Sequence, residues 1–268
     1  MSQLMPALEP YIRQRRAQRE AHGQAPILLM SHLVLGYPSL AVNQETIAAM
    51  AAAGVELVEL QIPFSEPIAD GPVIAQANQL ALDQGFRVEE GLEFAAACVQ
   101  RHPEVAFLLM TYSNILMAYG VERFIERAAQ MGIRGLIVPD WPPQEAGQPM
   151  ALCQAQTALD WIQLFTPTST DVRLQTIGRW ARGFCYCVAR KGVTGGRTDF
   201  DADLRHFLQR CRQVTDKPLA VGFGVRTSAD VQTLTPLAEI AVVGTAALEI
   251  QRTAGAVAVG AFFQKLRG

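Results

Sequence analysis

Short apolar runs alternate with amphipathic stretches along the whole chain. A strand buried on both faces is apolar throughout, whereas a helix that covers a sheet is apolar on one side only. The pattern predicts eight strand-then-helix units, with strands at 27–36, 55–62, 105–111, 135–140, 161–166, 184–189, 218–222 and 239–244. Eight such units favour a single (β/α)8 barrel, also called a TIM barrel, over an open doubly wound sheet, which usually holds fewer strands.

The helices expected between these strands show a clear periodicity. In 121–131, for example, Val121, Phe124, Ile125 and Ala128 fall on one helical face. The other predicted helices are 10–22, 42–53, 73–84, 88–101, 144–159, 171–180, 203–214 and 255–266. Because no linker or change in composition interrupts the chain, we expect one domain over 1–268. Residues 1–25 then add an extra N-terminal helix that covers the barrel.

Composition excludes several classes of partner. The 23 Lys and Arg residues nearly balance the 25 Asp and Glu residues, so the basic excess of a nucleic-acid-binding protein is lacking. No apolar run approaches the ~20 residues needed to cross a bilayer, so no membrane association is expected. The five cysteines form no CxxC pair, which favours reduced thiols in a cytoplasmic protein.

Two candidate acids lie near the carboxyl end of the second predicted strand: Glu59 within the strand and Asp70 in the segment after it. Barrel enzymes work at the carboxyl ends of their strands. Strand alternation places Glu56 and Glu59 on opposite faces, so one of them points into the barrel. Glu59 is then either a paired structural acid or a general acid or base. Asp70 follows in a proline-rich loop; an Asp before Gly often forms a turn, but together with Glu59 it makes a two-carboxylate site a candidate.

Glycines follow the last three predicted strands, at 192–196, 222–224 and 244. Any one of them alone is typical of a turn. Loops at these strands of a barrel commonly bind phosphate through backbone N–H groups, so the three together favour a phosphate site.

Lysine chemistry has few candidates, because the chain contains only Lys191, Lys217 and Lys265. Lys191 follows a predicted strand, where a Schiff-base lysine of an aldolase could lie. Such a lysine must be desolvated. Its neighbours Arg190 and Gly192 are more typical of a solvated loop. The four histidines lack metal-ligand spacing, so no metal site is expected.

One segment carries a family resemblance: ELQIPFSEPIADGPVIAQAN, residues 59–78. It resembles the signature of the tryptophan synthase alpha subunit family, in which a strand-end Glu precedes a PFSDP-type loop and ADGP. The resemblance continues through LVLGYPS, LLMTYSN, VPDWP, RGFCYCVARKGVTGG, PLAVGFGVRTSADV and VVGTA, and so covers about 27–250. It implies cleavage of indole glycerol phosphate to indole and glyceraldehyde 3-phosphate. It also implies that indole passes to a beta subunit that carries pyridoxal phosphate, with no cofactor in this chain.

The resemblance also implies roles for individual residues. Glu59 and Asp70 match the two catalytic acids, Tyr186 matches a Tyr close to the catalytic Glu, and Thr194 matches a Thr of a closing loop. The matches to the phosphate cradle are Gly195, Gly224, Gly244 and Thr245. The indole pocket would contain Phe223, together with Met110, Ile137 and Phe165, although the last three also suit a barrel core.

Some positions depart from the family pattern. Gln61 stands where Gly is common, Glu66 where the loop usually has Asp, Tyr37 where an Asp is usual, and Lys191 where a Ser is usual. Both acids are intact. Two alternatives therefore stay open beside the lyase: a divergent barrel that mainly binds and activates a beta-type partner, and a Schiff-base aldolase that uses Lys191.

Overall fold

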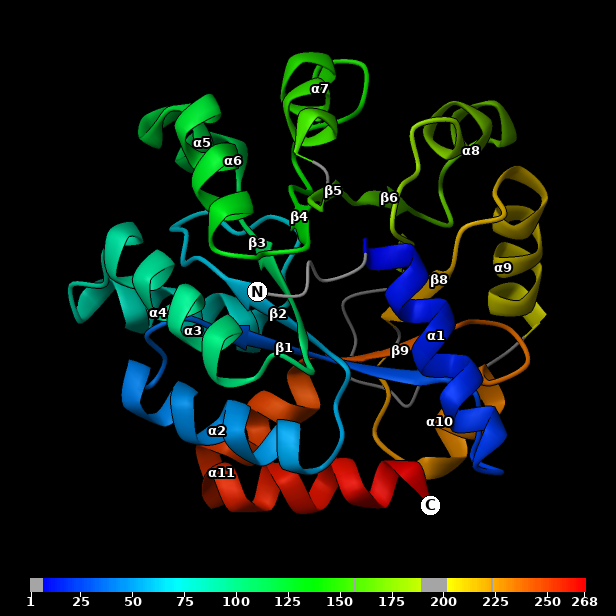
Figure 1. Ribbon diagram of the computed structural model, residues 1–268, viewed down its shortest axis with the longest axis horizontal. Helices are drawn as coiled ribbons and strands as arrows, with labels where there is room; N and C mark the ends of the chain where they lie inside the picture. Colours follow the sequence, from blue (N-terminus) through cyan, green and yellow to red (C-terminus); the bar gives the residue numbers. More distant parts are fainter. Residues whose placement is uncertain (1–6, 157, 189–201, 223) are drawn as a thin grey trace, which may run out of the picture.

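The sheet is built from short apolar strands. The computed structural model describes residues 7–156, 158–188, 202–222 and 224–268. The strands in these residues are β1 (Leu28–Val34), β2 (Leu57–Gln61), β3 (Ala106–Met110), β4 (Gly135–Ile137), β5 (Asp160–Trp161), β6 (Gln163–Phe165), β7 (Cys185–Val188), β8 (Leu219–Gly222) and β9 (Ile240–Val243). They are all parallel, in the order β5-β4-β3-β2-β1-β9-β8-β7-β6, and helices surround them (Figure 1).

The two end strands of this order are neighbours in the chain. β5 pairs with β4 and β6 pairs with β7, and Ile162 alone separates β5 from β6. The Ile162 N–H donates to the Leu136 carbonyl at 2.9 Å, which continues the ladder with β4. The predicted strand 161–166 is thus present as two short pieces that bring the ends of the sheet together. The predicted (β/α)8 barrel is confirmed.

The helices cover the outside of the sheet. They are α1 (Leu8–Ala21), α2 (Leu40–Ala52), α3 (Pro72–Asp83), α4 (Val88–Arg101), α5 (Ser113–Tyr119), α6 (Val121–Gln130), α7 (Gly147–Ala155), α8 (Asp171–Gly178), α9 (Ala202–Val214), α10 (Ser228–Leu234) and α11 (Thr245–Arg267). Figure 1 shows α11 beside α2, so the last helix lies against the first βα unit. Each predicted helix is present, whereas α5 and α10 were not predicted. α11 begins at Thr245 rather than at 255, and its backbone breaks at Gly255 (φ 78°).

Alternate residues of each strand belong to two different apolar clusters. Leu57 lies in the cluster inside the barrel, whereas Val58 and Leu60 lie in the cluster between sheet and helices. Leu8 and Ile12 of α1 belong to the inner cluster, so α1 packs against the amino-terminal end of the barrel. This alternation fixes which polar strand residues can meet inside the carboxyl-terminal mouth.

Candidate active site at the carboxyl ends of the strands

Glu59 occupies an inward-facing position of β2. In the register of the sheet it lies opposite His32 of β1 and Leu108 of β3. Its side chain is 3% exposed, and Oε1 is 3.2 Å from Nδ1 of His32. Oε2 is buried without a hydrogen-bond partner among the described residues. The carboxylate is therefore held at one oxygen and leaves the other available for a substrate.

Asp70 lies in the loop that joins β2 to α3. Its N–H donates to the Pro67 carbonyl at 2.9 Å, which fixes the local turn. Its Oδ2 accepts from Gln61 Nε2 at 2.6 Å and from the Tyr112 hydroxyl at 3.3 Å. Burial raises the pKa of Asp70, although His32 and the two donors act in the opposite direction. One oxygen of Asp70 is thus held by two donors at the barrel mouth.

Two tyrosines border these acids. Tyr186 of β7 belongs to the inner cluster, and a Cβ built at Gly222 of β8 would lie 3.2 Å from its hydroxyl. A side chain at Gly222 would crowd the phenol, which would have to shift by a few tenths of an ångström. Burial, Glu59 and Asp70 all raise the pKa of Tyr186 well above its ordinary value, so the phenol stays neutral. The ring of Tyr112, just after β3, stacks on Phe64 with centroids 4.9 Å apart.

Two described residues of the predicted phosphate cradle, Gly244 and Thr245, lie at the end of β9. Gly244 precedes the first residue of α11, Thr245, so the backbone N–H groups of a long helix begin there. A Cβ built at Gly244 would lie 3.7 Å from Cβ of His32, which places this helix start beside the acids. Gly224 has a positive φ of 71°. Four other predicted positions, Lys191, Thr194, Gly195 and Phe223, lie outside the described residues.

Two of the predicted indole-pocket residues face the barrel interior and one does not. Met110 and Ile137 belong to the inner cluster. Phe165 is completely buried in the outer cluster, and its neighbour Leu164 faces the interior instead. Strand alternation is the reason, because adjacent residues of β6 point to opposite faces. Phe165 therefore supports the sheet–helix layer and does not line the mouth.

Sequence reasoning missed three polar residues that contact the acids. His32, Gln61 and Tyr112 supply the contacts to Glu59 and Asp70 described above. A histidine within an apolar strand, at the same parity as inward-facing Met30, was the available signal for His32. For Gln61 the sequence shows only a departure from the family pattern. Of the other departures, Glu66 is exposed and Tyr37 is buried beside α3.

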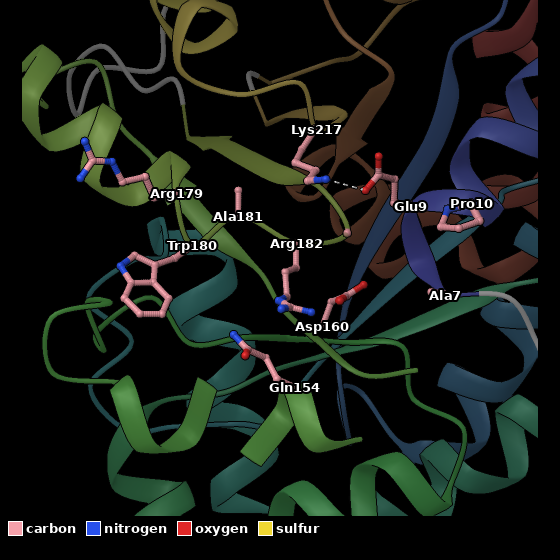
Figure 2. Close-up of a pocket in the computed structure, with 11 residues that line it drawn as sticks. Ala7, Glu9, Pro10, Gln154, Asp160, Arg179, Trp180, Ala181, Arg182 and Lys217 are labelled. Carbon is pink, nitrogen blue, oxygen red and sulfur yellow. Dashed lines mark hydrogen bonds and ion pairs between the residues drawn. The ribbon is translucent and has the colours of Figure 1, made fainter. Parts of the chain in front are cut away.

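Another cavity lies at the opposite end of the barrel. It has a volume of about 570 Å³, and the residues that line it include Asp160 at the start of β5 and Lys217 just before β8 (Figure 2). Lys217 pairs with Glu9 of α1 at 3.0 Å. Because barrel chemistry takes place at the carboxyl ends, this cavity is not a candidate active site.

Two other kinds of feature, metal-binding clusters and membrane-spanning helices, are absent from the described residues. No group of three or more His, Cys, Asp or Glu side chains there could hold a metal ion. None of the helices in this part of the chain has the length and apolar character needed to span a membrane.

Comparison with known proteins gives consistent matches. A family model described as tryptophan synthase alpha chain matches residues 18–258. The tryptophan synthase alpha chain of Desulforapulum autotrophicum is 48% identical over 97% of this chain and 99% of its own length.

Solved structures agree with these matches. A tryptophan synthase structure from Mycobacterium tuberculosis superposes with a TM-score of 0.87 at 32% identity, covering 98% of each chain. A structure from Pyrococcus furiosus, described as the tryptophan synthase a2b2 complex and its mutual activation, gives a TM-score of 0.82 at 30% identity. The match covers 89% of this chain and 96% of that one.

Proposed function

The chain belongs to the tryptophan synthase alpha chain family and is a lyase, and on this premise we propose that it cleaves indole glycerol phosphate to indole and glyceraldehyde 3-phosphate. The observation that carries the proposal is the pair of acids, Glu59 and Asp70, at the carboxyl-terminal mouth. Glu59 has a carboxylate oxygen without a hydrogen-bond partner among the described residues. A hydrogen bond from Gln61 fixes the orientation of Asp70. The reaction needs an acid and a base on one side of the substrate and a charge stabiliser on the other.

Glu59 is the acid and base of the proposed reaction. Protonation of indole C3 converts the ring into an iminium-like electron sink. Removal of the proton from the adjacent glycerol hydroxyl then breaks the carbon–carbon bond, forms the aldehyde and restores the indole ring. The unpartnered Oε2 of Glu59 is the oxygen that would face these atoms. Because the sink is made by proton transfer, the reaction requires neither a lysine Schiff base nor a metal or cofactor in this chain.

Asp70 stabilises the positive charge that develops on the ring. It would accept a hydrogen bond from the indole N–H, and that hydrogen bond strengthens as the iminium forms. Gln61 and Tyr112 hold its Oδ2, so the carboxylate does not need to reorient during the reaction. Met110 and Ile137 supply apolar contacts for the ring.

The substrate phosphate would bind at the start of α11. The N–H groups after Gly244 and the Thr245 hydroxyl are suited to an anion, and the helix dipole favours negative charge there. Gly224 and Gly195 complete the cradle in this proposal, Thr194 belongs to the closing loop, and Phe223 contacts the indole side.

The proposed partner is a tryptophan synthase beta subunit, which would receive the indole and carry pyridoxal phosphate. The likeness to the Pyrococcus furiosus a2b2 complex supports this assembly. The proposed compartment is the cytoplasm, which is consistent with five free, buried cysteines.

A direct assay tests the proposal. The purified chain is incubated with indole glycerol phosphate, and indole is measured with and without a beta subunit. We expect slow release alone and faster release in the complex. If no indole forms but the chain accelerates the beta subunit, the chain is a binding and activating protein. Borohydride treatment with substrate should give no adduct at Lys191, whereas a trapped adduct would favour the aldolase.

A further inference from the structure

Two buried polar side chains contact the two acids, one for each. His32 is 4% exposed and Gln61 is fully buried, and they come from the neighbouring strands β1 and β2. His32 Nδ1 lies 3.2 Å from Glu59, and Gln61 Nε2 donates to Asp70 at 2.6 Å. Gln61 favours the charged form of the His32 ring. No hydrogen bond joins the two side chains, since His32 Nε2 and Gln61 Oε1 are both buried without a hydrogen-bond partner among the described residues. Each acid therefore has one buried polar side chain of its own as a direct partner.

Burial of these polar side chains destabilises the folded chain unless they are paired. A carboxylate or an imidazolium buried alone is unfavourable, and removal of one partner of a pair leaves the other unpaired. Burial opposes the charge on His32, but Glu59, Asp70 and Gln61 together outweigh it and raise the pKa of the ring. Among the described residues, the phenols of Tyr186 and Tyr112, from β7 and the end of β3, also lie near the acids, and both are neutral.

We propose that His32 and Gln61 are positioning residues that hold Glu59 and Asp70 as one unit, with a single mobile proton kept between Glu59 and His32. This proposal rests on the proposed lyase function. The proton goes from the pair to indole C3, which leaves His32 neutral and Glu59 ionised beside the cationic ring. The proton of the glycerol hydroxyl then returns to the pair while the carbon–carbon bond breaks. The pair ends in its initial state, and the bonding electrons restore the indole ring.

The charge on His32 can be measured without turnover. In the full chain labelled with ¹⁵N-histidine, the ring nitrogens of His32 should report an imidazolium at pH 7.5. The substitution Glu59→Gln should make the ring neutral, because a buried cation then has lost its carboxylate. His22, His102 and His206 serve as internal references, and His32→Asn assigns the signal. A neutral His32 in the unchanged chain, or a charged one in Glu59→Gln, overturns the proposal. Failure of the indole assay alone would leave this result standing.

Two matched substitutions test the positioning role in the reaction. His32→Phe fills the ring volume without polar atoms, and we expect kcat/KM for indole release to fall by roughly 100-fold. His32→Asn keeps an amide donor near Nδ1 but cannot become charged. It should recover about tenfold of that loss, because a hydrogen bond to a charged group is worth about 1.5 kcal/mol or more. Its pH profile should lack the limb that belongs to the Glu59–His32 pair. Thermal unfolding of both variants checks that they are folded.

Gln61→Met tests the other half of the unit. This nearly isosteric change removes the donor to Asp70, and we expect a loss in kcat/KM of roughly tenfold. If both histidine variants and Gln61→Met alter thermal stability while kcat/KM and the pH profile stay unchanged, the four residues have only a structural role and the proposal is wrong.

Discussion

Glu56 and Glu59 are equally buried glutamates of one short segment, yet their surroundings differ. Glu56 is 1% exposed, and its Oε2 accepts from the Leu29 N–H at 2.9 Å and from Arg267 at 2.7 Å. Arg19 lies 3.6 Å from its other oxygen. Glu59 is 3% exposed and has His32 as its side-chain partner, with Oε2 unpartnered among the residues that the structure describes. Burial by itself therefore does not distinguish a structural acid from a functional one; the completeness of its partners does.

The partners of Glu56 come from both ends of the chain. Arg19 belongs to α1 and Arg267 is the last residue of α11, so one carboxylate ties the two terminal helices to the barrel. The partner of Glu59 comes from the adjacent strand and points to the same face. We therefore expect the outward acid to stabilise the fold and the inward acid to transfer protons.

The largest expected effect comes from Glu59→Gln. Loss of the acid and base should lower kcat for indole release by about 10²- to 10⁴-fold. The free energy of unfolding should change little, because His32 can lose its proton in this variant and no unpaired charge then remains buried. Steady-state indole release and urea denaturation measure the two quantities. A variant that keeps a tenth or more of the activity would exclude Glu59 from the chemistry.

Glu56→Gln should show the opposite pattern. It leaves Arg19 and Arg267 without their carboxylate, and both are poorly exposed, at 13% and 15%. We expect the free energy of unfolding to fall by about 3 kcal/mol, with kcat of the folded protein unchanged. The control is Glu104→Gln, whose side chain is 51% exposed and should change stability by less than about 1 kcal/mol. A large loss of kcat in folded Glu56→Gln would contradict the division between the two faces.

The difference between these two acids was only partly accessible from the sequence. Strand alternation predicts that Glu56 and Glu59 face opposite sides, and the apolar runs predict the barrel. The contact between His32 and Glu59 depends on the register of β1 against β2, which a single sequence does not give. The face to which Phe165 points depends on the short strand β6 and its interruption from β5 at Ile162, which the sequence pattern does not reveal. The helices α5 and α10 are one to two turns long, too short for periodicity to reveal.

Asp160 extends the comparison to the other end of the barrel. Burial raises its pKa from 3.8 to about 6, with Arg182 acting in the opposite direction. Between these values an unfolded chain loses the proton while the folded protein keeps it, so stability should fall as pH rises through this window. The expected fall is about 1–3 kcal/mol at roughly 1.4 kcal/mol per pKa unit.

Asp160→Asn should abolish this fall without lowering kcat, since the residue lies at the opposite end from the acids. Urea denaturation at a series of pH values between 4 and 6 measures the effect. An identical pH dependence in both proteins would mean that Asp160 titrates normally.

The smallest expected effect comes from Tyr112→Phe. This change removes one of the two side-chain hydrogen-bond donors to Asp70 and tests whether these donors matter for its role. The ring stacks on Phe64, and that contact survives, while the hydroxyl that donates to Asp70 at 3.3 Å is lost. We expect kcat/KM to fall roughly fivefold, which corresponds to a loss of about 1 kcal/mol of transition-state stabilisation.

The sign of the accompanying pH effect follows from the hydrogen bond. The Tyr112 hydroxyl stabilises the ionised carboxylate and so lowers the pKa of Asp70. Without the hydroxyl this pKa rises further above its ordinary value, and the acidic limb of the kcat/KM profile should move to higher pH. Gln61 still donates to the same oxygen at 2.6 Å, which keeps the shift small. An acidic limb that does not move, together with reduced activity, would assign the limb to the Glu59–His32 pair and make Tyr112 a contact of the loop alone.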